Sequence, residues 1–440
     1  WNKESERGAG RDPSKGLNPD FEPSVTYKPY VTWCHPASTS QENNTHYNFG
    51  QGDRYGENNF TDSNGRGGFR YEPPDGFLSL CTANMKDTDY ASIGPKGAAG
   101  TPDQHFDTLL YVDSYSSGNP NRVGGLNFKP DLVWIKCREG TESHSLTDSV
   151  RGAGRRIMSD NTNAEGGPTT GAQELTADGF VGSAGYGSDG DGTGHDFVAW
   201  CWKAGNGTVE NSDGTIQSRL SANREAGFSI VTYTGSNPAA VNTVGHGLSQ
   251  APEFIMIKTL VTADSWMVGH KSMGWGNALF LDTNAAESDN AAYWNDTDPT
   301  SSVFTISTSG KGNDPGKRLV AYCWHGVEGF SKFGEYTGNG ANPDNAFVYL
   351  GFKPALVITK KSSGTSSWAM WDNRRAPYNP NLQTLSADAT SAEITEGATY
   401  GMDFLSNGFK LHTNSSYAGE AQTYIYMAWA EMPFKYSNAR

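Results

Sequence analysis

Residues 128–136 read FKPDLVWIK, and the pattern returns as APEFIMIK at residues 251–258 and as FKPALVITK at residues 352–360. In each copy a proline precedes a short, mostly apolar run that ends in lysine. Proline can begin a buried strand but cannot occupy its centre, so the pattern predicts three buried β-strands. The prolines are 122 and 102 residues apart (252−130 and 354−252), which is too long for a solenoid repeat and predicts three homologous units of domain size.

A second strand is predicted to close each unit. It reads FVAWCW at residues 197–202, LVAYCW at 319–324 and YIYMAW at 424–429. Because side chains alternate along a strand, the first copy should place Val198, Trp200 and Trp202 on one face and Phe197, Ala199 and Cys201 on the other. Both faces are apolar, so each closing strand is expected to lie between two layers, as at the centre of a sandwich.

Length and composition favour several β domains. The chain has 440 residues, 53 of them glycine and 21 proline, with no long amphipathic helical pattern. We therefore predict an all-β chain of tandem β-sandwich (jelly-roll or concanavalin-like) domains. The predicted segments are an extended segment with the end of a β-sandwich at 1–100, repeat 1 at 101–206, a β-linker with an Asp213-Gly214 hairpin at 207–226, repeat 2 at 227–328 and repeat 3 at 329–440.

The charge balance argues against nucleic acid as a partner, because the net charge is −14 and no basic cluster occurs. No apolar run is long enough to predict membrane insertion. The sequence opens at Trp1 without methionine, as expected of a processed or partly covered product. The five cysteines are scattered, without a CxxC or Cys/His cluster, so no zinc site is predicted. Cys201 and Cys323 occupy equivalent places in two closing strands, which predicts buried free thiols rather than a disulfide between them.

Two groups of phrases resemble known families. Residues 48–52 (NFGQG) and 68–85 (GFRYEPPDGFLSLCTANM) resemble the end of the SPRY-like, concanavalin-like sandwich of bacteriophage proteins. Residues 227–235, 321–340 and 403–411, with the ending at 438–440, resemble a repeated phage domain of unassigned function found in tail-fibre-like proteins. The resemblance implies a virion protein made in the bacterial host cytoplasm, a homo-oligomer that by analogy is a trimer, and other virion proteins as partners. It supplies no catalytic residues.

Three candidate sites have competing structural interpretations. Asp148, His270 and Asp372 each lie 18 residues after the proline of their copy (148−130, 270−252, 372−354). Because the residue type changes between copies, structural hydrogen bonding is favoured over a ligand role. Residues 189–196 have the oxygen-rich look of a calcium loop, although a solvated turn is favoured. Aromatic residues in predicted loops could stack on a sugar or pack in a core or interface: Trp266, Trp275, Tyr293, Trp294, Trp368, Trp371 and Tyr378.

No catalytic motif, cofactor-binding residue or metal ligand set is predicted, because the chain lacks a GxSxG elbow, an HExxH helix and a P-loop. The first hypothesis is a non-enzymatic phage structural protein, a tail fibre or similar appendage that contributes to host attachment. The second is an adhesin that binds host surface glycan through the loop aromatics. The third is a polysaccharide depolymerase.

Overall fold

The structure of the chain is a computed structural model. This structure describes residues 60–63, 72, 101–113, 121–167, 172–182, 194–205, 207–236, 240–395 and 401–431. These residues form antiparallel β-sheets joined by turns, with one short helix, α2 (Gly310–Asn313), and two 3-10 turns. The predicted all-β sandwich fold is confirmed. The SPRY-like resemblance lies almost wholly outside the described residues.

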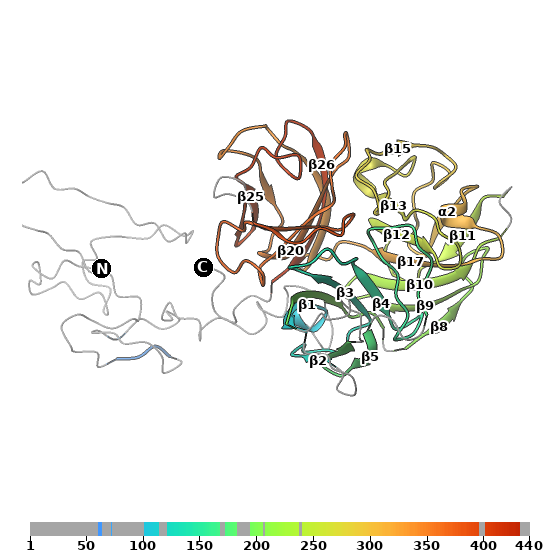
Figure 1. Ribbon diagram of the computed structural model, residues 1–440, viewed down its shortest axis with the longest axis horizontal. Coiled ribbons are helices and arrows are strands. Elements are labelled where there is room, and N and C mark those ends of the chain that lie inside the picture. Colours follow the sequence, from blue (N-terminus) through green and yellow to red (C-terminus); the bar gives the residue numbers. More distant parts are fainter. Residues whose placement is uncertain are drawn as a thin grey trace, which may run out of the picture. The chain divides into compact units, whose positions relative to one another are not determined.

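Module 1 comprises β1 to β7 and is a sandwich of two antiparallel sheets (Figure 1). Its large sheet has the order β1 (Phe106–Val112), β7 (Asp196–Trp202), β3 (Leu132–Cys137) and β4 (Ser145–Asp148). Its small sheet has the order β2 (Asn121–Gly124), β6 (Gly179–Gly182) and β5 (Ala172–Thr176). A local core that includes Ile135, Phe180 and Phe197 fills the space between the two sheets.

Module 2 comprises β8 to β17 and repeats this plan. Its large sheet has the order β13 (Met267–His270), β12 (Phe254–Thr259), β17 (Arg318–Trp324), β10 (Phe228–Thr234), β9 (Ser218–Asn223) and β8 (Val209–Asn211). Opposite lie β11 (Asn242–Gly245) and β16 (Val303–Ile306), while β14 (Asn277–Ala278) pairs with β15 (Ser288–Asp289). The predicted hairpin around Asp213-Gly214 forms as β8 and β9, and β9 pairs with β10 to extend the large sheet.

Module 3 comprises β18 to β26. Its large sheet has the order β18 (Ser331–Thr337), β26 (Thr423–Ala430), β20 (Pro354–Lys361), β21 (Ala369–Asp372), β22 (Gln383–Ser386) and β23 (Ile394–Thr395). Its small sheet has the order β19 (Phe347–Tyr349), β25 (Gly408–Leu411) and β24 (Met402–Leu405). Modules 2 and 3 each have a local core between their sheets, as module 1 does.

The repeated sequence pattern accounts for the repeated plan. Pro130 and Pro252 lie just before β3 and β12, and Pro354 is the first residue of β20, so none removes a hydrogen bond from the middle of a strand. Each proline-led strand pairs with the closing strand of its module, β7, β17 or β26. In β7, Phe197, Ala199 and Cys201 face the local core of module 1, as alternation predicts.

The other face of each large sheet contributes to one central core shared by the three modules. Trp202, Trp324 and Trp429 meet in this core, one from each closing strand. Their ring centroids are 6.3 Å, 6.1 Å and 5.4 Å apart, and all three pairs are edge-to-face, with interplanar angles of 67°, 70° and 72°. The described residues from 101 to 431 accordingly belong to one compact unit. The second apolar face of each closing strand is thus covered by sister modules.

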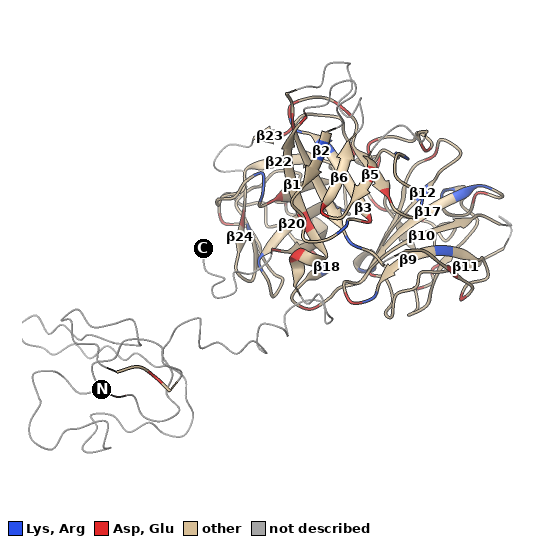
Figure 2. Ribbon diagram, turned by 90° about the horizontal axis from the view of Figure 1, so that it is seen from below, with Lys and Arg blue, Asp and Glu red and all other residues tan. Residues whose placement is uncertain are grey.

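Charged residues interrupt the large sheets at few places (Figure 2). Among these charged residues are the three lysines that end the proline-led pattern, Lys136, Lys258 and Lys360, which are all buried. The described part of the chain contains no helix with the length and hydrophobicity that a membrane crossing requires.

Candidate functional site

The polar residues that the repeat brings together lie at the junctions between modules. At each junction the backbone N–H of a glutamate in one module donates to the carbonyl eight residues after the proline of the next. The pairs are Glu165 with Leu260 (3.1 Å), Glu287 with Ser362 (3.0 Å) and Glu393 with Arg138 (2.7 Å). Module 1 therefore contacts module 2, module 2 contacts module 3, and module 3 contacts module 1. The three junctions close a ring.

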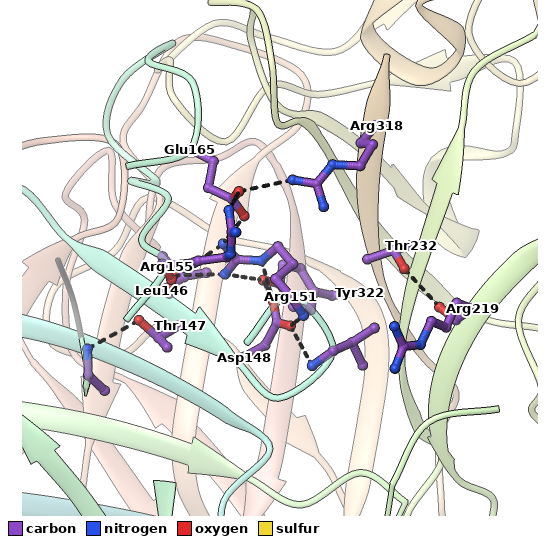
Figure 3. Close-up of polar contacts among 12 residues, drawn as sticks. Leu146, Thr147, Asp148, Arg151, Arg155, Glu165, Arg219, Thr232, Arg318 and Tyr322 are labelled. Atoms are coloured by element: carbon purple, nitrogen blue, oxygen red, sulfur yellow. Dashed lines mark hydrogen bonds and ion pairs between the residues drawn. The ribbon is translucent and has the colours of Figure 1, made fainter. Parts of the chain in front are cut away.

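A buried ionic cluster fills the junction between modules 1 and 2 (Figure 3). Asp148 ends β4, and its Oδ1 accepts the backbone N–H groups of Val150 (3.0 Å) and Arg151 (2.8 Å), which fixes the following turn. Its Oδ2 accepts from Arg151 Nε at 2.5 Å and from the hydroxyl of Tyr322, in β17 of module 2, at 2.7 Å. Arg151 Nη1 then reaches Glu165 Oε1 at 3.2 Å.

Electrostatics keep this cluster charged although it is removed from water. Burial opposes the charge on Arg151, but Asp148, Tyr322 and Glu165 together outweigh it and hold the pKa of Arg151 above its ordinary value. Burial raises the pKa of the Tyr322 hydroxyl well above its usual range, so this group stays a neutral donor. Arg155 and Arg318 also bind Glu165, at 2.8 Å and 3.1 Å. The cluster therefore satisfies its own charges within the junction.

The junction between modules 3 and 1 repeats this chemistry with a different partner. Asp372 Oδ2 accepts from Arg375 Nε at 2.5 Å and from the indole N–H of Trp200, in β7 of module 1, at 3.1 Å. Arg375 Nη1 lies 2.9 Å from Glu393, which also binds Arg138 of module 1 at 2.9 Å. The hydrogen bonds to Glu393 raise the pKa of Arg138.

The third junction is built without an ion pair at these positions. His270 replaces the aspartate, and its Nδ1 accepts the backbone N–H of Ser272 at 3.1 Å. Met273 replaces the arginine, and Met427 occupies the strand position of Tyr322 and Trp200. Burial lowers the pKa of His270 to about 3, partly opposed by the backbone of Tyr426. The imidazole is therefore neutral at physiological pH.

The predicted structural hydrogen-bonding role of Asp148, His270 and Asp372 is confirmed, and the contacts show what that role serves. Sequence reasoning missed Arg151 and Arg375, although each lies 21 residues after its proline, at the position of Met273. This shared spacing was the signal that could have revealed them.

Buried lysines also reach across two of the junctions. Lys258 Nζ donates to the carbonyls of Thr162 in module 1 (2.9 Å) and Asp264 (2.7 Å), and Lys360 Nζ lies 3.4 Å from the carbonyl of Asn284 in module 2. Burial lowers the pKa of both lysines to about 8. Both amines donate to main-chain carbonyl oxygens, which satisfy these donors where burial removes them from water.

The loop aromatics do not assemble a sugar-binding platform, which corrects the glycan-binding interpretation of this set. Stacking on a sugar needs an open ring face. Five of the rings are at most 5% exposed, namely Trp266, Trp275, Trp294, Trp368 and Trp371. Tyr293 is partly buried against the core of module 2, and Tyr378 alone of the seven is largely exposed, at 85%.

Two of these tryptophans are junction residues. Trp266 donates its indole N–H to the carbonyl of Met158 in module 1 at 2.8 Å, and Trp368 donates to the carbonyl of Phe280 in module 2 at 3.0 Å. The residue at the same distance from the first proline is His144, whose Nε2 lies 2.9 Å from the carbonyl of Ser386 in module 3. The three side chains thus occupy equivalent places in the ring.

The structure describes the predicted buried thiols but not most of the predicted calcium loop. Cys201 and Cys323 are buried free thiols, as predicted, and Cys137 is a third. Cys137 Sγ lies 3.8 Å from His195 Nδ1. Cys34, Cys81 and residues 189–193 of the calcium candidate lie outside the described residues.

The central core leaves little room for a ligand. It contains an apolar void of about 10 Å³, lined by residues that include Trp202, Trp324 and Trp429. Small-molecule sites are usually larger than about 300 Å³. This void therefore cannot accept an organic substrate.

A comparison with protein-family models finds a match over most of the chain. A family model described as a domain of unknown function, DUF7483, matches residues 101–433. The matched span begins before β1 and ends after β26, so it covers the whole ring of three modules rather than a single repeat. No curated protein and no solved structure matches the chain.

Proposed function

Because this chain belongs to the DUF7483 family of domains of unknown function, whose model spans the complete three-module ring, we propose that the ring is a structural unit. We propose specifically that the chain is a non-enzymatic structural protein of a bacteriophage particle, a tail fibre or similar appendage that contributes to host attachment. The single observation that carries the structural part is the use of the buried polar groups. Asp148 binds Arg151 and Asp372 binds Arg375, and all four of these side chains are completely buried. The two aspartates also accept hydrogen bonds from the neighbouring modules, Asp148 from Tyr322 and Asp372 from Trp200.

The phage assignment is supported by sequence phrases rather than by geometry. The resemblance to tail-fibre-like repeats covers residues 227–235, 321–340 and 403–411, which lie within the matched span. A scaffold role agrees with the positions of these residues, which contribute to strands of the sheets. The Gly-Phe-Ser phrase at 227–229 opens β10, and residues 321–324 end the closing strand β17.

Immunogold electron microscopy of purified particles tests the location of the protein. An antibody against the ring should label an appendage at a fixed site on each particle, and the chain should remain with the particles through a density gradient. Unlabelled particles together with free chain in the infected-cell lysate would overturn the virion assignment.

Light scattering tests the proposed homo-trimer and is independent of the location. The full chain has a mass of 47.4 kDa, so a trimer should have three times that mass at all but the lowest concentrations. A monomer at every concentration would show that the threefold arrangement is complete within one chain.

A further inference from the structure

Module 1 contains a group of potential metal ligands at one end of its sandwich. Cys137 is the last residue of β3, His195 lies directly before β7, and Glu142 lies in the turn between β3 and β4. The pairing of β3 with β7 places Cys137 opposite Phe197, and Arg138 N–H donates to the carbonyl of Asp196 at 2.8 Å. The sheet register therefore brings the thiol and the imidazole together.

The ligand atoms are at distances that suit one tetrahedral ion. Cys137 Sγ, His195 Nδ1 and a carboxylate oxygen of Glu142 all lie within 4.8 Å of one another, and the sulfur–nitrogen distance is 3.8 Å. With Zn–S and Zn–N bonds of about 2.3 Å and 2.05 Å, a tetrahedral ion separates the two atoms by about 3.6 Å. Small side-chain movements would complete the coordination.

A second observation points to a missing partner. Glu142 Oε2 is buried from solvent and, among the described residues, has no hydrogen-bond partner outside the group, where the Glu142 carboxylate interacts with the Cys137 thiol. A buried carboxylate oxygen without a donor is costly, and a bound cation would remove that cost. Lys136 supports the same turn, because its Nζ donates to the carbonyls of Cys137 (2.8 Å) and Gly140 (3.1 Å).

The repeat itself does not require this group. Counted from the proline, Cys137 corresponds to Thr259 and Lys361, and Glu142 corresponds to Asp264 and Ser366. Counted back from the closing tryptophan, His195 corresponds to Lys317 and Gln422. Modules 2 and 3 fold without these three residues, so the group is a feature added to module 1.

We propose that Cys137, Glu142 and His195 bind one divalent cation of the zinc class. Thiolate, imidazole and carboxylate together form a ligand set that suits Zn²⁺ and its spectroscopic substitute Co²⁺. On binding, the thiol loses its proton to solvent and the sulfur forms the metal bond, while His195 binds as the neutral imidazole. Three protein ligands leave the fourth position to water. The ion ties the end of β3, the turn and the start of β7 together.

The test is a Co²⁺ titration of the full chain, kept reduced with a phosphine, followed by absorption spectroscopy. One equivalent should produce a thiolate-to-cobalt charge-transfer band and the intense d–d bands of a tetrahedral site, and Zn²⁺ should displace both. Cys137→Ser should abolish the charge-transfer band. Cys323→Ser is the matched control. The Cys323 thiol is also buried near the end of a strand, but among the described residues it does not belong to a group of metal-binding side chains. The Cys323→Ser variant should therefore keep the band.

His195→Gln and Glu142→Gln keep the test decisive if Cys137→Ser does not fold. Both side chains are only partly buried, and each change should weaken Co²⁺ affinity by more than about tenfold. Zn²⁺ should raise the melting temperature of the wild type and not that of either variant. A charge-transfer band that persists in Cys137→Ser, as Cys34 or Cys81 could produce, or equal affinity in all variants, would overturn the proposal.

Discussion

Replacing Trp324 with alanine should destabilise all three modules, although Trp324 belongs to module 2. The side chain is 2% exposed, and its ring packs against Phe228 at 4.8 Å, Phe254 at 5.3 Å, Trp202 at 6.3 Å and Trp429 at 6.1 Å between centroids. Removing a buried tryptophan costs about 3 to 5 kcal/mol, and the favourable aromatic pairs place Trp324 in the upper part of that range. We expect a loss of about 4 to 5 kcal/mol.

Hydrogen exchange measured by mass spectrometry can locate this loss. A cost of about 4 kcal/mol should speed exchange through unfolding by about 10³-fold, since about 1.4 kcal/mol corresponds to a factor of ten. Peptides from β7, β17 and β26 should accelerate by the same factor, because Trp202, Trp324 and Trp429 share one core. Acceleration confined to module 2 would refute the shared core as the unit of cooperativity.

Phe304→Ala provides the matched control. Phe304 is fully buried in the local core of module 2 and packs against Tyr233 at 6.2 Å, without belonging to the central core. The cost should also be about 3 to 5 kcal/mol. Faster exchange should first appear in β11 and β16, while β7 and β26 keep more of their protection than in Trp324→Ala.

The other predictions concern the junctions and the thiols. Arg151→Met should lower the free energy of unfolding by about 3 to 5 kcal/mol in chemical denaturation, because it leaves the buried Asp148 carboxylate without its ion-pair partner. Adding Asp148→Leu should recover part of that stability. A double variant no more stable than the single one would contradict this account. Burial lowers the pKa of His144 and of His270 to about 3, below the ordinary 6.5. Their stabilisation is therefore complete above about pH 6.5 and is lost as the pH falls towards 3, by about 1.4 kcal/mol per pH unit for each. His270→Gln should reduce the acid-side slope of melting temperature against pH, and an unchanged slope would exclude His270 as a cause. Cys323 should resist alkylation in the native chain and react once the chain is denatured.

The positions of the strands, and the sheet face on which each side chain lies, could be predicted because they follow from local rules. Proline can only begin a buried strand, and alternation assigns each side chain of β7 to a face, so Trp200 and Cys201 were placed correctly on opposite sides. The covering layer could not be predicted in the same way. An apolar face shows that something covers it, but not whether that layer is another sheet of the same module or a sister module.

The tryptophans pack in the core, as one of their two interpretations predicts, and sugar stacking failed for a related reason. Trp266 and Trp368 lie between core strands in the sequence, where loops are usually exposed, yet both are fully buried at module junctions. Their equal distance from Pro252 and Pro354 was the available sign of a structural role. The group of Cys137 and His195 had no such sign, because the two residues are far apart in sequence and only strand pairing brings them together.

The change from aspartate to histidine and back follows from the residue across each junction. Asp148 accepts from Tyr322 and Asp372 accepts from Trp200, whereas Met427 occupies the equivalent strand position at the junction that contains His270. A buried carboxylate needs donors, which tyrosine and tryptophan supply and methionine cannot. A neutral imidazole carries no charge that buried donors must balance, and the junction that has it also lacks the arginine. Residue type at this position is therefore determined by the neighbouring module rather than by the repeat. Three equivalent junctions with different chemistry distinguish the correct order of modules from any other, because exchanging two modules would bury an aspartate against methionine.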